Sequence, residues 1–187
     1  RRAREFWGKL DHAGLALPNE ARGEANKFSP ASLVTKATPA IQNNLKLVGE
    51  NASSTLIAAW QVMAWRLSGQ MSFSIGVTSN GRGYEELESA VGVFAKALPI
   101  HSSFEGDLRF EEVAAQAGKS VRDAIEVQEY YRMGDGFGGG DPVNFEYVAL
   151  PRAVSGGGVR FEVVRQEAIL ERSKLKENVA VLCIDLD

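Results

Sequence analysis

The sequence predicts an α/β or α+β fold in which helices pack on a largely central sheet. Two observations support this class: apolar residues recur at helical spacing in some segments, and they alternate or run continuously over short stretches in others. The helix-like and strand-like segments are mixed along the chain, which is typical of layered folds with both kinds of element. The clearest helical segments are 53–67 and 110–125, and the clearest strand-like segments are 71–77, 143–150, 159–164 and 179–186.

The composition is that of an ordinary globular protein. The chain has 187 residues, of which 44% are hydrophobic and 24% charged, and this length suits one domain or one lobe of a larger protein. A net charge of -3 without a dense Lys/Arg cluster argues against a nucleic-acid partner. No apolar run approaches the ~20 residues of a spanning helix, so we expect no membrane partner. The single Cys183 excludes an intrachain disulfide, which is compatible with a cytoplasmic location.

The first forty residues mix helical and irregular signals. Phe6, Trp7 and Leu10 have helical spacing, so a helix is expected at the start, and the absence of an initial Met suggests a fragment. Residues 12–30 are interrupted by glycine and proline and predict a surface crossing. A strand is expected over 32–38, and Pro39 suits the first turn of a helix that ends near Gly49.

The segment 53–67 is the strongest helix prediction. Candidate N-cap residues precede its apolar stripe, which is wide enough to predict burial over most of the helix surface. The N-cap candidates are Ser53, Ser54 and Thr55, and the stripe is Leu56, Trp60, Met63 and Leu67, with Ile57 and Ala64 beside it. Ser68-Gly69 is expected to end the helix, and the following strand carries Phe73, Ile75 and Val77 on one face.

The segment 75–101 predicts a strand, a long loop and a second strand. A long loop with few bulky apolar residues inside a compact domain is usually functional. A turn over 104–107 and an amphipathic helix of about five turns are expected next. Near the C-terminus, the continuous apolar run at 179–186 suggests a strand covered on both faces.

Local motifs give no complete catalytic site. Gly134, Gly136 and Gly139 fit G-x-G-x-x-G, but the order of strand and helix around them is the reverse of a dinucleotide site, so a flexible loop is expected. The two histidines, His12 and His101, are not paired on a helix, and no nucleophile elbow presents a serine. The spacing of histidine and cysteine supports no metal site.

The central stretch carries three segments in a fixed order. Residues 66–70 read RLSGQ, residues 75–82 read IGVTSNGR, and residues 91–101 read VGVFAKALPIH. They resemble the "RLSGQ", "GTPVANR" and "GxFVNTLPLR" segments of the condensation domains of nonribosomal peptide synthetases, and the spacing from Gly76 through His101 matches without a gap. Three weaker similarities are Phe6-Trp7 to "YW", Leu17-Pro18 to "LP" and residues 127–130 to "HQDYPFE".

The resemblance implies the C-terminal lobe of a chloramphenicol-acetyltransferase-like fold, incomplete at both ends. In this family two lobes enclose a tunnel, an HHxxxDG motif on the N-terminal lobe catalyses amide formation, and substrates arrive on the phosphopantetheine arms of carrier proteins. The implied partners are therefore the N-terminal lobe and the donor and acceptor carrier proteins, with no cofactor in the lobe itself. A lobe of this transferase, an enzyme of antibiotic biosynthesis, is not expected to act alone.

The resemblance also places site residues. It implies no catalytic residue and no metal ligand in this chain, a floor loop at 76–88 that crosses to the other lobe, and a flexible or latch-like loop at 134–142. The implied tunnel and floor-loop residues are Gly76, Ser79, Asn80, Arg82, Gly92, Phe94, Lys96 and Leu98.

Two residues depart from the family pattern. Lys96 stands where the family usually has asparagine, and His101 where it has arginine. If Lys96 faces the tunnel, its charge would favour an anionic substrate group or hinder the standard reaction. Alternatively, the substitution is tolerated without a functional effect, and the side chain of Lys96 reaches solvent. Two further functions stay open: a standalone acyltransferase of the same superfamily, and an inactive docking domain that binds carrier or tailoring proteins.

Overall fold

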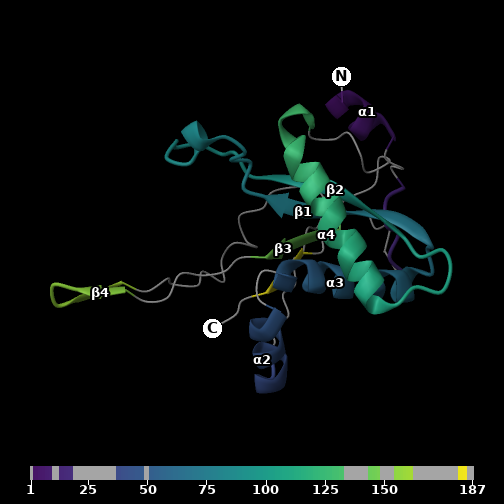
Figure 1. The fold of residues 1–187 in the computed structure, drawn as a ribbon, viewed down its shortest axis with the longest axis horizontal. Helices are drawn as coiled ribbons and strands as arrows, with labels where there is room; N and C mark the ends of the chain where they lie inside the picture. The colour runs from purple at the N-terminus through teal and green to yellow at the C-terminus, as the bar shows by residue number, and fades with distance from the viewer. Residues whose placement is uncertain are drawn as a thin grey trace, which may run out of the picture.

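The computed structural model describes residues 2–9, 13–18, 37–48, 51–132, 143–147, 154–161 and 181–184. Its helices are α1 (Arg2–Lys9), α2 (Pro39–Val48), α3 (Ala52–Ser68) and α4 (Phe110–Glu126), with short 3-10 turns at Glu85–Leu87 and Gln128–Tyr130. Its strands are β1 (Ser72–Ser79), β2 (Lys96–Ser103), β3 (Asn144–Tyr147), β4 (Val154–Gly156), β5 (Val159–Phe161) and β6 (Val181–Ile184). The mixed α/β class is confirmed (Figure 1).

The main sheet has the strand order β2-β1-β3-β6 and combines both pairing directions. β1 and β2 are antiparallel and stay in register from Ser72↔Ser103 to Ser79↔Lys96, while β3 is parallel to both β1 and β6. Gly14 adds an isolated bridge to Ser74 on β1. β4 and β5 form a separate two-stranded hairpin.

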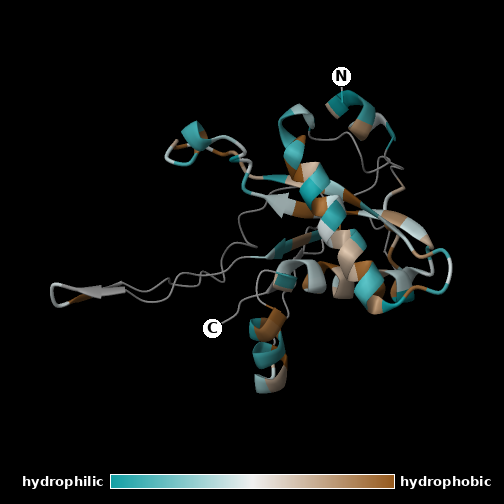
Figure 2. Cartoon of the chain, viewed as in Figure 1, coloured by the Kyte–Doolittle hydropathy of each residue, from teal (hydrophilic) through white to brown (hydrophobic). Residues whose placement is uncertain are grey.

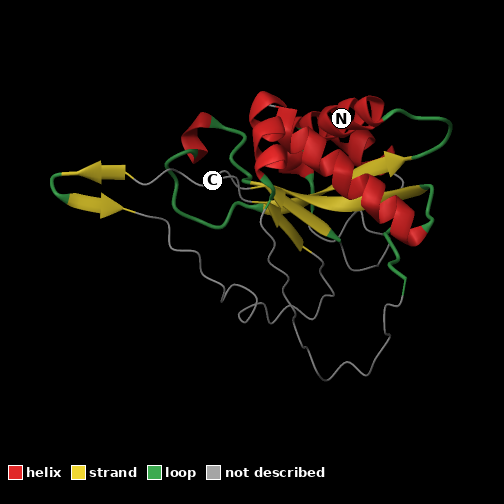
Figure 3. Ribbon diagram, turned by 90° about the horizontal axis from the view of Figure 1, so that it is seen from below, coloured by secondary structure: helices red, strands yellow, loops and turns green. Residues whose placement is uncertain are grey.

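The core lies between the sheet and the helices α3 and α4, which cover one of its faces (Figure 3). Phe73 and Ile75 of β1 point to this face and are completely buried, as the alternation predicts, and Ile100 lies opposite Ile75 on β2. Phe104 stacks on Trp65 with ring centroids 5.0 Å apart and on Phe73 at 5.8 Å. Large aromatic rings therefore join α3 to the first strand, where their burial stabilises the fold.

The helix boundaries follow the sequence signals, with one correction. Pro39 opens α2, and Gly69 ends α3 in a left-handed conformation with φ 72. The prediction of a Ser53, Ser54 or Thr55 cap was wrong, because Asn51 is the N-cap and it makes no side-chain capping bond. The hydroxyl of Thr55 instead donates to the carbonyl of Asn51 at 3.0 Å, a bond within the first turn of the helix.

The predicted burial of α3 was also partly wrong. Met63 and Leu67, from the predicted stripe, have exposed fractions of 42% and 54%. The buried arc is instead formed mainly by Ile57, Ala58, Gln61 and Ala64. Small side chains on this arc let α4 approach closely, and that contact decides which side of a broadly apolar helix is covered.

Several expectations fall outside the described residues. They include the loop at 134–142 and most of the strand expected at 32–38, of which residues 37 and 38 are described and are not in a strand. The crossing at 12–30 is described only over residues 13–18. The three strands expected after residue 143 correspond to β3, β5 and β6, and parts of each prediction lie outside the described residues. β4 was not predicted. Among the described helices, none is long and apolar enough to cross a membrane.

Candidate functional site

The feature that best fits a functional site is the loop 80–95, which joins β1 to β2. It projects from the sheet to one side of the molecule (Figure 1). Of the floor loop predicted at 76–88, residues 76–79 belong to β1 and residues 80–88 lie in this loop. Since Ser79 and Lys96 are paired in the sheet, the two stems of the loop leave it side by side.

The base of the loop depends on a close approach at Gly81. Gly81 has φ 69, and a Cβ atom there would lie 1.8 Å from the backbone oxygen of Phe94. Only glycine leaves room for the two stems to come this close. The predicted residue Gly92 also lies here, since a Cβ atom on it would be 2.9 Å from the Phe94 ring.

Arg82 links three parts of the same loop. Its guanidinium carbon lies 4.7 Å from the centre of the Phe94 ring, and its Nη1 donates to the carbonyl of Leu87. Its backbone N–H donates to Oδ1 of Asn80 at 3.0 Å. The cation–π contact and these hydrogen bonds give the loop a shape of its own beyond the sheet.

Gln128, which follows α4, contacts both stems of the loop. The hydroxyl of Ser79 donates to Oε1 of Gln128 at 2.7 Å, and Nζ of Lys96 donates to the backbone carbonyl of Gln128 at 2.9 Å. The ammonium of Lys96 thus has the kind of partner that its partial burial requires. Sequence reasoning missed Gln128, and its place in the segment 127–130 was the only signal for it.

The outer part of the loop exposes apolar and acidic residues together. Val91 and Val93 are fully exposed, and Tyr84 is exposed beside Glu85 and Glu86. Figure 2 shows apolar and hydrophilic stretches in this projecting segment. Both valines thus expose apolar surface on a loop that is tied together at its base.

Two of the predicted site residues lie in the sheet and not at the loop. Leu98 is buried in the hydrophobic core on the helix side. Gly76 lies where a Cβ atom would come within 1.8 Å of Oδ1 of Asn144, so it permits close packing of β1 and β3. The structure therefore gathers Ser79, Asn80, Arg82, Gly92, Phe94 and Lys96 at the loop and gives Gly76 and Leu98 packing roles.

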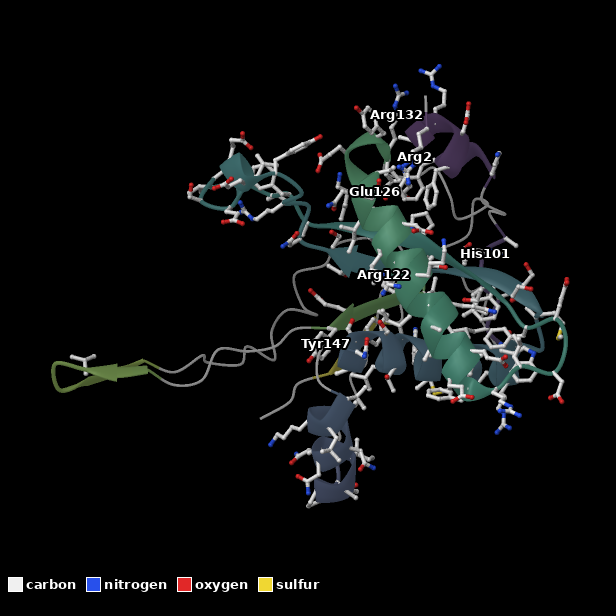
Figure 4. The ribbon with its side chains drawn as sticks, in the orientation of Figure 1. Arg2, His101, Arg122, Glu126, Arg132 and Tyr147 are labelled. Carbon is white, nitrogen blue, oxygen red and sulfur yellow. The ribbon has the colours of Figure 1, made fainter. Side chains whose placement is uncertain are left out.

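The histidines do not form a catalytic pair in the described part of the chain. Nε2 of His101 lies 3.4 Å from the hydroxyl of Ser72, and its buried Nδ1 has no hydrogen-bond partner among the described residues. Figure 4 shows His101 away from the labelled Arg2 and Glu126. His12 lies outside the described residues, and the described ones hold no cluster of three or more potential metal ligands.

Comparisons with known proteins identify the family of the chain. Residues 1–133 match the model of the family described as "Condensation domain". The chain belongs to this family. Curated relatives include bacitracin synthase 1 of Bacillus licheniformis, 25% identical over 138 residues, and malpibaldin synthetase of Mortierella alpina, 27% identical over 120 residues. The alignments cover 70% and 62% of this chain.

Solved structures share the fold. A four-domain nonribosomal peptide synthetase, holo-AB3403, superposes with a TM-score of 0.64 at 18% identity, over 80% of this condensation-domain chain and 13% of the synthetase. SgcC5 from Streptomyces globisporus gives a TM-score of 0.62 at 17% identity, over 85% of this chain and 40% of SgcC5. The chain spans only 3% of bacitracin synthase 1 and 2% of malpibaldin synthetase.

Proposed function

We propose that this chain is the C-terminal lobe of a condensation domain that forms amide bonds between substrates tethered to carrier proteins. The proposal rests on one observation above all: the loop 80–95 projects from the sheet with Val91 and Val93 fully exposed. Burying a valine side chain is worth about 1.5 kcal/mol or more, so a surface that covers both would gain considerable stability. In this proposal the second lobe covers the two valines, and the loop forms the floor of the tunnel between the two lobes.

In the proposed reaction the amine of the acceptor attacks the thioester carbonyl of the donor. The C–N bond forms, the C–S bond breaks, and the donor's phosphopantetheine sulfur leaves as a thiol that takes up the proton lost by the amine. The second histidine of an HHxxxDG motif on the other lobe would orient or deprotonate the amine. The described residues of this chain would close the tunnel, exclude water and help to hold the reacting groups together.

The carrier proteins and the N-terminal lobe are the partners in this proposal. The phosphopantetheine arms belong to the carriers and enter as part of the substrates. The sequence upstream of Arg1 is informative here: an intact HHxxxDG motif supports catalysis, whereas a degraded motif would favour an inactive docking domain. Carrier and adenylation domains in the same protein would indicate a multidomain synthetase, and their absence would indicate a standalone acyltransferase.

The exposed valines test the proposal directly. In the complete condensation domain, we expect the double variant Val91→Ser/Val93→Ser to lower the rate of amide formation about tenfold or more, because the loop loses apolar contacts with the other lobe. Mass spectrometry of the carrier-bound product measures this rate. Val159→Ser changes an exposed valine of β5 outside the loop and serves as the control. Equal rates for the double variant and the control would overturn the proposal.

A further inference from the structure

The end of α4 meets the loop 80–95 at the point where both of its stems leave the sheet. Ser79 is the last residue of β1, Lys96 is the first residue of β2, and the two are direct partners in the antiparallel ladder. Gln128 follows α4 and is bonded to both. We propose that Gln128, Ser79 and Lys96 form a clamp that fixes the direction in which the loop projects. This inference rests on the proposed function, in which the loop reaches a second lobe.

The bond between Ser79 and Gln128 is the more deeply buried part of the clamp. The hydroxyl-to-amide distance is 2.7 Å, and the exposed fractions are 7% for Ser79 and 2% for Gln128. A hydrogen bond shielded from water is costly to break, because the freed groups lack solvent to replace the partner. The same hydroxyl accepts the backbone N–H of Gly81 at 3.3 Å. The side chain of Gln128 is thus coupled to the first turn of the loop.

The second stem is held by the backbone of Gln128. Nζ of Lys96 donates to its carbonyl at 2.9 Å. This carbonyl lies just beyond the C-terminal end of α4, where the helix dipole favours a positive charge. The long side chain of lysine spans from the strand to this carbonyl. The lysine that departs from the family pattern therefore has an internal partner, and the geometry assigns it to holding the loop and not to binding an anionic substrate.

The loop also lies against Gln128 further along. A Cβ atom on Gly83 would be 3.2 Å from Nε2 of Gln128 and 3.2 Å from Oε1 of Glu129. Glycine at this position lets the backbone of the loop pass close to the turn after α4. Gln128 therefore contacts the loop at Gly83 as well as at its two stems. A change in the Gln128 side chain should for this reason alter the direction of the whole loop.

The clamp is built on a fixed support. Nε1 of Trp7 donates to the carbonyl of Val127 at 3.0 Å, and the Trp7 ring lies 4.9 Å from the ring of the buried Tyr131. These contacts hold the residues on both sides of Gln128 against α1. Beyond the clamp, the described contacts of the loop are largely internal, such as the one between Arg82 and Phe94. The direction in which the loop projects is therefore set by the contacts of its two stems with Gln128.

The chain offers a matched control for this role. Gln70 lies just before β1, at the opposite end of that strand, and also ties a connecting segment with its side chain. Its Oε1 accepts the N–H of Ala16 at 2.7 Å, and its Nε2 donates to the carbonyl of Gly14 at 3.2 Å. Gln70→Leu therefore removes the same amide and bonds of the same kind far from the loop, whereas Gln128→Leu removes the clamp.

The test combines amide hydrogen exchange and kinetics in the complete condensation domain. We expect Gln128→Leu to speed exchange of the loop 80–95 about fivefold and to lower kcat/KM for amide formation, while Gln70→Leu leaves both loop exchange and kcat/KM near wild type. Lys96→Met should speed loop exchange in the same direction. Loop exchange that is equal in Gln128→Leu and Gln70→Leu would overturn the clamp.

The two proposals fail in different ways. If the proposed function is wrong, the wild-type domain forms no amide product, and loop exchange still reports on the clamp. If only the clamp is wrong, the wild-type domain forms product and the loop exchanges at the same rate with and without the Gln128 side chain. A Ser79→Ala/Gln128→Leu double variant completes the test: its effect on loop exchange should be smaller than the sum of the single effects. Additive effects would contradict the direct bond.

Discussion

Replacing Gly81, which is buried, with alanine should destabilise the base of the loop. The residue has φ 69, a conformation that costs an alanine about 1 kcal/mol. A Cβ atom would also lie 1.8 Å from the oxygen of Phe94, where ordinary contacts begin at 3.4 Å, so the two stems must separate. Forced overpacking of this kind costs about 1–3 kcal/mol. We therefore expect Gly81→Ala to lower the free energy of unfolding by about 2–4 kcal/mol.

Gly69 supplies the control that separates the two contributions. It has φ 72, but a Cβ atom there would meet nothing within 4 Å. Gly69→Ala should therefore show the conformational cost alone, about 1 kcal/mol. Urea unfolding of both variants measures the difference, and thermal unfolding should show a larger fall in melting temperature for Gly81→Ala. Costs that agree within about 0.5 kcal/mol would show that the close approach of Gly81 to Phe94 is absent.

Three further expectations concern packing and surface charge. Phe73→Ala should lower the free energy of unfolding by about 3–5 kcal/mol in urea, because the ring is completely buried; a cost below about 1 kcal/mol would contradict the assigned core. Gly76→Ala should lower the free energy of unfolding, because the added methyl group would overlap the Asn144 side chain. Adding Asn144→Ala should restore part of that stability in the same assay, and no recovery would show that the two side chains do not compete for space. Arg2→Ala removes an exposed ion pair with Glu126 (Figure 4), so it should cost less than about 1 kcal/mol at low salt; a larger cost would indicate a buried role.

Local periodicity predicted the elements around the site well. The alternation of Phe73, Ile75 and Val77 identified β1 and its apolar face, although Ser74 on the other face is buried as well. The segment 75–101 was correctly expected to form strand, loop and strand. Both signals are local, since a strand's faces alternate with every residue. The same reasoning found β5 but not its partner β4, because β4 has only three residues and so shows no clear alternation.

Tertiary contacts account for what sequence reasoning missed. The broad apolar surface of α3 allowed several buried arcs, and the packing of α4 selected the one that leaves Met63 and Leu67 exposed. The bond between Ser79 and Gln128 joins residues 49 positions apart, so no spacing pattern could reveal it. Because glutamine is usually exposed, the sequence alone predicts a surface position for Gln128, and only the packing of the surrounding elements shows that it is buried.

The central claim is that this chain supplies one lobe of an amide-forming domain and depends on the other lobe for catalysis. The most direct measurement compares carrier-bound donor and acceptor substrates incubated with the purified chain alone and with the complete condensation domain, using mass spectrometry to detect the amide. We predict product with the complete domain and none with the chain alone, once circular dichroism shows that the chain is folded. Amide formation by the folded chain alone, or none by the complete domain, would contradict the account.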